Sequence, residues 1–536
     1  MKNYQKTCCA LLVAGLFAPC AQAEGIVTLD EAGGGTKRAA SAKFEIKDFV
    51  LEGATLFSEV EIDKVLAPFI GKGKDFTDVQ RAQKAIETAY AAHGLSAVSV
   101  ILPEQKVQDG VIHLHVIESH FGRVAVHGNR FYSEANVLKS IPSVRSAGIP
   151  RQRQITRDLR LANENPSKQT AVVLKQGSKP DEVDAELYVT DSNPSMFGIT
   201  LDNTGSPETG NTRLGLTYSN ANLFDADQVL TVQYLTSPQF PNRVNVLGAG
   251  YKLPLYRLGD SAEFFAGYSN VNSVVGGLAN FQGGGALFSA RYNHFLEKLG
   301  KFDQRIAFGV DWRDFFRVEQ TNPAPVILYR EVAVLPVSVS YLAQGKYARS
   351  DLNVQASLSK NIPVAGNGGA ADFAAYDPSG NLKPNVNYTV ARYEARYNAL
   401  LGEDWQFRAL ASGQYSRDTL IFGEQMRLGG ADAVRGFAEG SESGDRGLRM
   451  SVEGYSPKFG AGKLKARVLA FFDEGQVSSS IGSARSSISG AGLGLRVAYS
   501  NNLSCRLDMA RIINAGTDPK QRVGDWRAHV SITATF

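Results

Sequence analysis

The stretch Ala391-Arg-Tyr-Glu-Ala-Arg-Tyr-Asn-Ala399 decides how the larger part of this chain folds. Every odd position holds alanine or tyrosine, and every even position holds a charged or amide residue. Only a β-strand places successive side chains on opposite faces. The stretch therefore predicts a strand with one apolar face and one charged face.

The same alternation recurs in 306–313 and in 527–536, the last ten residues of the chain. A soluble β-sandwich also alternates, so the period alone leaves a sandwich and a membrane barrel open. Reading the pattern through the chain predicts sixteen strands that start near residues 198, 212, 227, 243, 261, 285, 302, 331, 349, 388, 404, 447, 464, 488, 502 and 525.

The connections between these predicted strands favour the barrel. Short connections fall near 221–227, 254–260, 297–301, 344–348, 401–404 and 500–502. Long connections fall near 272–284, 317–328, 361–386, 418–446, 476–487 and 513–524. Outer-membrane barrels have short turns on one rim and long loops on the other, and closure removes exposed strand edges. We therefore predict a transmembrane β-barrel of sixteen antiparallel strands over 194–536.

Two small α+β modules are predicted before the barrel, over 44–119 and 120–193. The first reads as strand, helix, helix, strand, strand, and the second is a weaker copy in which Val126-His-Gly-Asn129 echoes Leu51-Glu-Gly-Ala54. The expected signals in the first module are a capping box at Ser58 and Glu61, a second at Thr77 and Gln80, a helix end at Gly94 and a turn at Asp109-Gly110.

The N-terminal region predicts export. Residues 1–23 resemble a secretory signal peptide, and 24–43 read as a flexible leader that contains Gly33-Gly-Gly35. Removal of the signal peptide leaves Cys505 as the sole cysteine, so neither an internal disulfide nor a cysteine-based metal site is expected. Removing Lys2 and Lys6 lowers the formal charge from +4 by two to +2, which gives no support to nucleic-acid binding.

The stretch Gln425–Phe437 reads as a long loop with a fixed internal shape. It holds three glycines and ends in Val434-Arg435-Gly436-Phe437, and it has neither helical nor strand period. Arg435 carries five donors that favour a planar acceptor. On the strand 464–475 the parity predicts that Asp473 faces the barrel lumen, where the loop could bring Arg435 to it.

Several motifs together resemble a known family, the TpsB transporters of two-partner secretion, of the FhaC and ShlB type. The patterns Tyr90-x-x-x-Gly94, Leu102-Pro-x-Gln105 and Asp109-Gly-Val-x-x-Leu-x-Val-x-Glu118 are similar to the first POTRA module of that family. Val434-Arg-Gly-Phe437 resembles its signature in the sixth extracellular loop, and Phe471-x-Asp473-x-Gly475 resembles the partner motif on strand thirteen. The resemblance covers essentially all of 44–536.

This resemblance implies two periplasmic POTRA modules, at 44–119 and 120–193, in front of a barrel in the outer membrane of a Gram-negative bacterium. Members bind the N-terminal secretion domain of one large exoprotein and pass it unfolded to the surface. The implied partners are that exoprotein, membrane lipid and the barrel assembly machinery, since Phe536 resembles the C-terminal insertion signal of such barrels. The family implies no enzyme activity, catalytic residue, cofactor or metal.

One departure from the family concerns the pore. Better-known members carry an N-terminal plug helix, whereas about twenty residues separate the predicted signal peptide from Phe44, and three consecutive glycines oppose a helix there. How the resting pore is sealed stays open at this level. So does the choice between gating and anchoring for Arg435.

Two other functions compete with secretion. A BamA-type assembly factor would act on barrel precursors, and such proteins typically carry more POTRA modules than the two expected here. A diffusion porin would leave the first third of the chain unexplained. A metal site at His113 and His115 is disfavoured because alternate strand positions supply two ligands at best.

Overall fold

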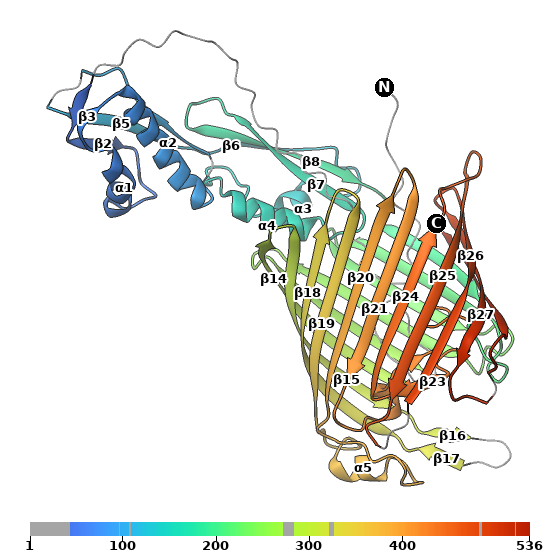
Figure 1. The fold of residues 1–536 in the computed structure, drawn as a ribbon. Coiled ribbons are helices and arrows are strands. Elements are labelled where there is room, and N and C mark those ends of the chain that lie inside the picture. Colours follow the sequence, from blue (N-terminus) through green and yellow to red (C-terminus); the bar gives the residue numbers. More distant parts are fainter. Residues whose placement is uncertain are drawn as a thin grey trace.

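The computed structural model describes residues 43–536 except 96, 107–108, 272–283, 321–325, 482–484 and 520. The chain forms a closed barrel with two small modules at one end (Figure 1). The predicted signal peptide and the leader up to residue 42 lie outside the described residues. Over the described ranges, every helix is too short or too polar to span a membrane.

Module 1 (residues 44–119) is a three-stranded sheet packed against two helices. Its elements are β1 (Phe44–Ile46), β2 (Asp48–Glu52), α1 (Glu59–Leu66), η1 (Ala67–Phe69), β3 (Gly71–Lys74), α2 (Phe76–Ala92), β4 (Val98–Ile101) and β5 (Val111–Glu118). The central strand β5 runs parallel to β2 and antiparallel to β4. The pair β1–β3 was not predicted, because Gly71-Lys-Gly-Lys74 carries no alternation.

The local signals of module 1 are confirmed with one correction. The capping box at Ser58 and Glu61 is present at the start of α1. The second box was wrongly predicted at Thr77 and Gln80, since α2 begins earlier and the Asp75 carboxylate accepts the amides of Thr77 (2.8 Å) and Asp78 (3.2 Å). A carboxylate is a strong acceptor at the positive end of a helix, which explains the earlier start.

The Glu118 carboxylate at the end of β5 ties three parts of module 1 together. It accepts the Tyr90 hydroxyl at 2.7 Å and the amides of Thr55 and Leu56 at 2.8 and 2.9 Å, and it also contacts the Thr55 hydroxyl. Partial burial raises the pKa of Glu118, but the hydrogen bonds lower that pKa by more than burial raises it. The net pKa therefore lies below the usual value of 4.5. The motif residues Tyr90 and Glu118 therefore form one structural contact.

This contact predicts acid sensitivity of module 1. Because the folded-state pKa of Glu118 is lowered, its stabilising contribution is present above about pH 4.5 and is lost as the pH falls through the folded-state pKa. We expect Glu118→Gln to lower the stability of module 1 at neutral pH and to flatten its acid dependence. Urea denaturation of a 43–119 fragment, followed by circular dichroism at pH 7 and at pH 3, checks this. Equal acid dependence in both proteins would contradict it.

Module 2 (residues 120–193) repeats the same arrangement. Its elements are β6 (His120–His127), α3 (Glu134–Ser140), α4 (Gln152–Ala162), β7 (Lys168–Gln176) and β8 (Glu182–Asp191). The central strand β8 runs parallel to β6 and antiparallel to β7, as β5 does with β2 and β4. The start of α4 contacts module 1, where the Gln152 amide and the Arg153 guanidinium donate to the carbonyls of Gly94 and Ala92 at 2.9 and 3.1 Å.

A buried ion pair fastens module 2 to the barrel. Lys168 donates to Asp227 Oδ2 at 2.6 Å, and both side chains are at most 1% exposed. Lys168 also donates to Asn136 Oδ1 at 2.8 Å, and the Tyr256 hydroxyl donates to the same oxygen of Asp227. Burial lowers the pKa of Lys168 although the neighbouring carboxylate opposes the shift. Lys168 lies on β7 and Asp227 in the turn between β10 and β11, so this pair joins module 2 to the barrel.

The barrel closes with sixteen antiparallel strands, as predicted. They are β9 (Ser195–Asp202), β10 (Arg213–Leu223), β11 (Gln228–Thr236), β12 (Asn245–Leu255), β13 (Asp260–Ser269), β14 (Gly285–Leu299), β15 (Phe302–Phe315), β18 (Val332–Lys346), β19 (Ser350–Ile362), β20 (Thr389–Leu401), β21 (Trp405–Tyr415), β24 (Arg446–Tyr455), β25 (Leu464–Ser478), β26 (Arg485–Tyr499), β27 (Leu503–Ala515) and β28 (Trp526–Thr535). Each start lies within three residues of the predicted position. The last strand β28 pairs with the first, β9, and closes the sheet.

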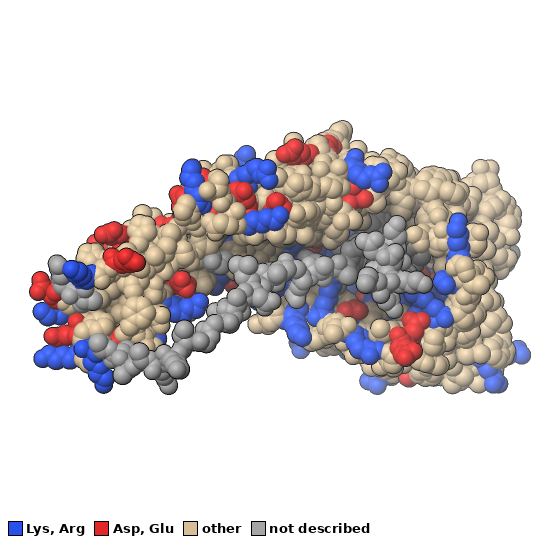
Figure 2. All heavy atoms as spheres, turned by 90° about the horizontal axis from the view of Figure 1, so that it is seen from above, with Lys and Arg blue, Asp and Glu red and all other residues tan. Residues whose placement is uncertain are grey.

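The two faces of the barrel wall differ as the alternation predicts. On β15, Phe308 and Trp312 are 54% and 41% exposed on the outer face, whereas Asp311 on the other parity is buried and pairs with Arg313 at 2.6 Å. Seen from the module end, the outer wall is mostly uncharged, and charged side chains gather on the modules and around the opening (Figure 2). A broad exposed apolar wall of this kind matches a lipid environment.

Short elements occupy the loops at the end of the barrel away from the modules, here called the distal end (Figure 1). They are the hairpin β16–β17 (Val318–Gln320 and Val326–Tyr329), α5 (Ala370–Ala375), η2 (Phe422–Glu424) and the hairpin β22–β23 (Met426–Leu428 and Glu442–Gly444). These loops lie between the strands that were predicted to have long connections.

Candidate functional site: a loop folded into the barrel

The loop between the eleventh and twelfth barrel strands, residues 416–445, is called the inner loop because it folds back into the barrel. Its hairpin β22–β23 lies against β25, the thirteenth strand. Gly429, Gly430 and Gly436 all have positive φ, at 94°, 111° and 102°. A side chain at Gly430 would also meet the Glu439 carboxylate at 2.1 Å. These three glycines therefore shape the tip that presents Arg435.

Arg435 makes the predicted contact with Asp473. Its Nε donates to Oδ2 at 2.6 Å and its Nη2 donates to Oδ1 at 2.8 Å, and the Arg435 amide also donates to Oδ2 at 3.1 Å. Both side chains are at most 3% exposed. A buried bidentate pair of this geometry holds the position and the orientation of the loop tip together.

The Arg435 guanidinium is surrounded on its remaining sides. Its Nη1 lies 2.8 Å from Glu453 Oε1 and 3.7 Å from Asp508 Oδ2, and its central carbon lies 3.5 Å from the centre of the Phe471 ring. The Ser451 hydroxyl donates to Asp473 Oδ1 at 2.6 Å. The motif residue Phe471 is thus a stacking surface for Arg435, which combines charge and π contact in a desolvated place.

Two further arginines balance the acidic groups around this site. Arg496 and Arg506 both donate to Asp508, at 2.7 Å each. Arg506 also donates to Asp432 Oδ1 at the tip of the inner loop, at 2.6 Å. A buried carboxylate is costly unless it is paired, so this network lets Asp508 stay charged beside the Arg435–Asp473 pair. Glu453, Asp508, Arg496 and Arg506 were not predicted from the sequence.

The other motif residues fix the tip by packing. Val434 and Phe437 are fully buried in an apolar cluster. The cluster also contains Leu428, Val477, Ile488 and Ile512. The amide of Gly436 donates to His529 Nε2 on the last barrel strand, at 3.2 Å. The tip therefore contacts four successive strands, β25 to β28.

A row of glycines makes room for the loop tip. Gly475 on β25 faces Leu428 and Val434, and a Cβ there would approach the Leu428 side chain to 2.7 Å. On β26, a Cβ at Gly490 would lie 2.1 Å from the Arg435 carbonyl oxygen, and one at Gly492 would meet the Phe471 ring at 2.7 Å. Gly475 was predicted as a motif residue, whereas the two on β26 were not, although they share the lumen-facing parity.

This close approach predicts that Gly490→Ala displaces the inner loop. Because the added methyl group would overlap a backbone oxygen rather than a flexible side chain, the tip must move and the Arg435 pair must lengthen. We expect secretion of a client to fall at least tenfold, with proteolytic cleavage appearing within 425–445. Gly454→Ala is the matched control, because nothing lies within 4 Å of a Cβ there. Equal behaviour of the two variants would contradict the prediction.

The base of the inner loop is also tied to the wall. Glu424 is 2% exposed and contacts Arg313 at 2.5 Å and Arg392 at 2.9 Å. Arg392 was predicted to face the lumen, and its contact with this loop confirms that side. Asp445 at the other end of the loop accepts the Ser480 amide at 2.8 Å and its hydroxyl at 2.6 Å.

Other candidate sites carry no comparable geometry. His113 is half exposed and lies 3.7 Å from Glu52. In the part of the chain that the structure describes, no three histidine, cysteine, aspartate or glutamate side chains are grouped for a metal. Cys505 is a free, partly buried thiol on β27.

Comparisons with known proteins agree with this architecture. The model of the family "Haemolysin secretion/activation protein ShlB/FhaC/HecB" matches residues 182–497, and "POTRA domain, ShlB-type" matches 44–119. The heme/hemopexin transporter protein HuxB of Haemophilus influenzae strain 86-028NP is 20% identical over 431 residues, which is 77% of this chain and 72% of HuxB. The outer membrane transporter CdiB of Dickeya dadantii is 22% identical over 424 residues, 75% of this chain and 71% of CdiB. The solved structure of CdiB from Escherichia coli superimposes with a TM-score of 0.73 at 18% identity and covers 98% of this chain and 94% of that one.

Proposed function

The chain belongs to the haemolysin secretion/activation protein family ShlB/FhaC/HecB, and from this premise we propose how it takes up and exports its partner. It is an outer-membrane transporter of two-partner secretion, with its POTRA region in the periplasm and the distal end of its barrel at the cell surface. We assign module 2 as a second POTRA module. The strand directions of its sheet, which repeat those of module 1, support that assignment.

The partner is one cognate exoprotein, which the modules recognise through its N-terminal secretion domain. The free edges of the two module sheets support recognition by strand addition. Among the described strands, β7 pairs only with β8, and Val173 and Leu174 on β7 are 37% and 40% exposed. An extended client strand placed along β7 would gain backbone hydrogen bonds and apolar contacts beside the barrel. Positive and negative side chains are interspersed on the modules, which favours such a backbone-led contact over a purely charged one (Figure 2).

The Arg435–Asp473 contact carries the transport proposal. A loop that occupies the lumen and is held by a buried bidentate pair has two well-defined arrangements, paired and released. We assign to Arg435 the role of keeping the inner loop in a transport-competent place within the channel. Membrane lipid and the barrel assembly machinery complete the set of partners. The apolar outer wall of the barrel supports them.

A deletion strain tests secretion against the alternative of barrel assembly. The gene is deleted, and candidate exoproteins encoded by long, repeat-rich reading frames beside it are followed in the periplasm, at the surface and in the medium. Retention of one exoprotein with normal levels of all other outer-membrane barrels is expected. Loss of many barrels with unchanged exoproteins would support an assembly factor instead.

A further inference from the structure

We propose that the exoprotein crosses the barrel along the inner wall of β18, β19 and β20 and leaves by displacing the lid loop, residues 363–388, which closes the extracellular end. This inference rests on the proposed function, because it assumes that an extended polypeptide passes through the barrel. It adds the surface that the polypeptide meets and the part of the protein that seals the resting pore.

The tip of the inner loop lies away from the wall of β18–β20, although Glu424 at the base of the loop pairs with Arg392 on β20 at 2.9 Å. The tip contacts Asp473, Asp508 and His529 on β25, β27 and β28 through Arg435 and Gly436. On β18 and β19 the register places small or amide side chains on the lumen face of this wall, among them Ser340, Ser357, Asn353 and Gln355. On β20 the same face carries Arg392, Glu394 and Arg396. This lining offers hydrogen bonds and no broad apolar surface, which suits a moving extended chain.

Water reaches this wall from the periplasmic side. Glu394 and Arg396 face the lumen next to Gln355 and Asn353 and pair with each other at 2.9 Å, yet their side chains remain 42% and 49% exposed. Closer to the surface on the same face, Ser359 and Asn361 are only 7% and 1% exposed. The accessible lumen therefore ends between these two levels.

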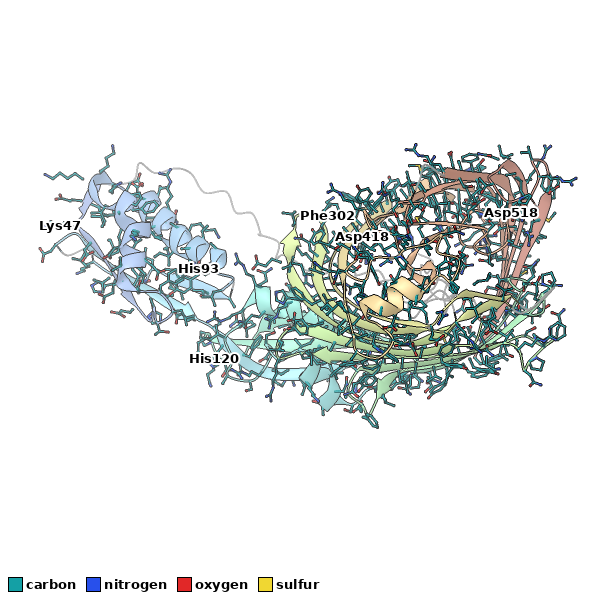
Figure 3. The ribbon with its side chains drawn as sticks, turned by 90° about the horizontal axis from the view of Figure 1, so that it is seen from below. Lys47, His93, His120, Phe302, Asp418 and Asp518 are labelled. Carbon is teal, nitrogen blue, oxygen red and sulfur yellow. The ribbon has the colours of Figure 1, made fainter. Side chains whose placement is uncertain are left out.

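An apolar cluster forms the seal at that point. Unlike the rest of the lumen face, the extracellular ends of the strands from β12 to β20 carry inward apolar side chains. Phe373 and Tyr376 of the lid loop pack onto them and are 1% and 3% exposed. The buried members of the cluster are Val244, Val246, Phe265, Leu287, Phe315, Val332, Val334, Phe373, Tyr376, Tyr388, Val390, Leu420 and Ile421. Helix α5 lies across the barrel opening in the view from the extracellular side (Figure 3).

Hydrogen bonds and ring stacking hold the lid loop in place. Tyr376 accepts the Arg330 amide through its carbonyl at 2.8 Å and the Phe422 amide through its hydroxyl at 3.1 Å, and its ring stacks on Tyr329 at 5.1 Å. Hydrogen bonds hold the two ends of the lid loop. The side-chain amide of Asn367 donates to Asp314 at 2.9 Å, and that of Asn385 donates to Asp418 at 2.8 Å.

The lid loop is easier to displace than the inner loop. In the described chain, no ion pair joins 363–388 to other residues, whereas the inner loop is held by buried pairs at Glu424 and Arg435. Separating a buried ion pair leaves uncompensated charges, while displaced apolar and neutral contacts can be replaced by an emerging polypeptide. The exit therefore lies at the lid loop.

Reversible disulfide bonds at the ends of the lid loop test whether the exoprotein leaves the barrel there. In a Cys505→Ser background, the pairs N367C with D314C and N385C with D418C place a disulfide at each end of the lid loop. Oxidation is expected to reduce surface delivery of the exoprotein at least tenfold, and a reductant is expected to restore it. The matched control is N398C with D351C, an Asn–Asp contact of the same 2.9 Å between β19 and β20 below the lid. Delivery at the parent level with the lid locked overturns the proposal.

Two further measurements separate its parts. The double variant Phe373→Ser, Tyr376→Ser is expected to raise the resting conductance in planar bilayers several-fold. Lys383→Ser in the same loop is the control. An unchanged conductance would show that the lid loop is not the seal.

A photoreactive amino acid at Ser357 is expected to cross-link the exoprotein, whereas one at the outward-facing neighbour Leu358 is not. Equal cross-linking, or none from position 357, overturns the path. If the unlocked parent exports no exoprotein at all, the proposed function fails instead.

Discussion

Arg435→Ala is expected to abolish export while a folded barrel remains in the outer membrane. The substitution removes both bonds to Asp473 and the stacking on Phe471, and it leaves a carboxylate that is fully buried in the lumen wall. Breaking a buried pair in this way costs about 3–5 kcal/mol, which is enough to release a loop tip. The ladder of barrel hydrogen bonds does not depend on the pair, so the fold persists.

The measurements are secretion of the exoprotein and heat-dependent migration of the barrel on gels. Asp473→Ala is expected to match Arg435→Ala, since either change removes one half of the same contact. Arg435→Lys keeps the charge but loses the planar fork, so intermediate secretion is expected. Arg417→Ala is the control, because Arg417 is an exposed arginine of the same loop. Secretion at the wild-type level from Arg435→Ala would refute the role assigned to this residue.

Lys168→Met is expected to loosen module 2 from the barrel, with the second largest effect. It leaves Asp227 buried between Tyr256 and Asn165 without a cation, again at a cost of about 3–5 kcal/mol. The turn that carries Asp227 is strained as well, since Phe224, Asp225 and Asp227 all have positive φ, at 58°, 51° and 57°. The turn therefore depends on this contact to keep its shape.

Protease cleavage between module 2 and the barrel, followed over a urea series, measures this effect. Adding Asp227→Asn to Lys168→Met removes the unpaired charge and is expected to recover part of the resistance, because the buried site is then neutral. Lys139→Met on α3 is the control, since Lys139 is exposed. If the Lys168→Met variant is cleaved at the same urea concentration as the wild-type protein, the ion pair does not hold module 2 on the barrel.

The barrel could be predicted closely because each of its strands lies between lipid and a polar lumen. That environment imposes the two-residue period on every strand, as in Ala391–Ala399, and the same parity places Asp473 in the lumen. The contact between Arg435 and Asp473 could be predicted because the loop that carries Arg435 is long enough to fold back into the barrel. Parity alone could not predict Glu453 and Asp508, because their approach depends on the register between strands distant in sequence.

Features of the fold that leave no periodic pattern could not be predicted from the sequence. The lid loop carries no alternation, and its apolar cluster becomes visible only when the ends of six strands are brought together. Lys168 and Asp227 lie 59 residues apart in different domains, and neither belongs to a motif. The start of α2 was misplaced for a simpler reason, since Asp75 and Thr77 both compete as helix caps and the carboxylate prevails.

The unequal attachment of the two modules has a consequence for capture. Module 2 is attached to the barrel by a buried ion pair, whereas module 1 meets module 2 at the helix end near Gly94, through hydrogen bonds from the Gln152 amide and the Arg153 guanidinium. We therefore expect module 2 to stay fixed on the barrel while module 1 rotates relative to it. A client bound to module 1 is tethered beside the pore, and its effective concentration there is on the order of millimolar. Transport of a bound client is then an intramolecular step, whose rate per bound client does not depend on the concentration of free client in the periplasm.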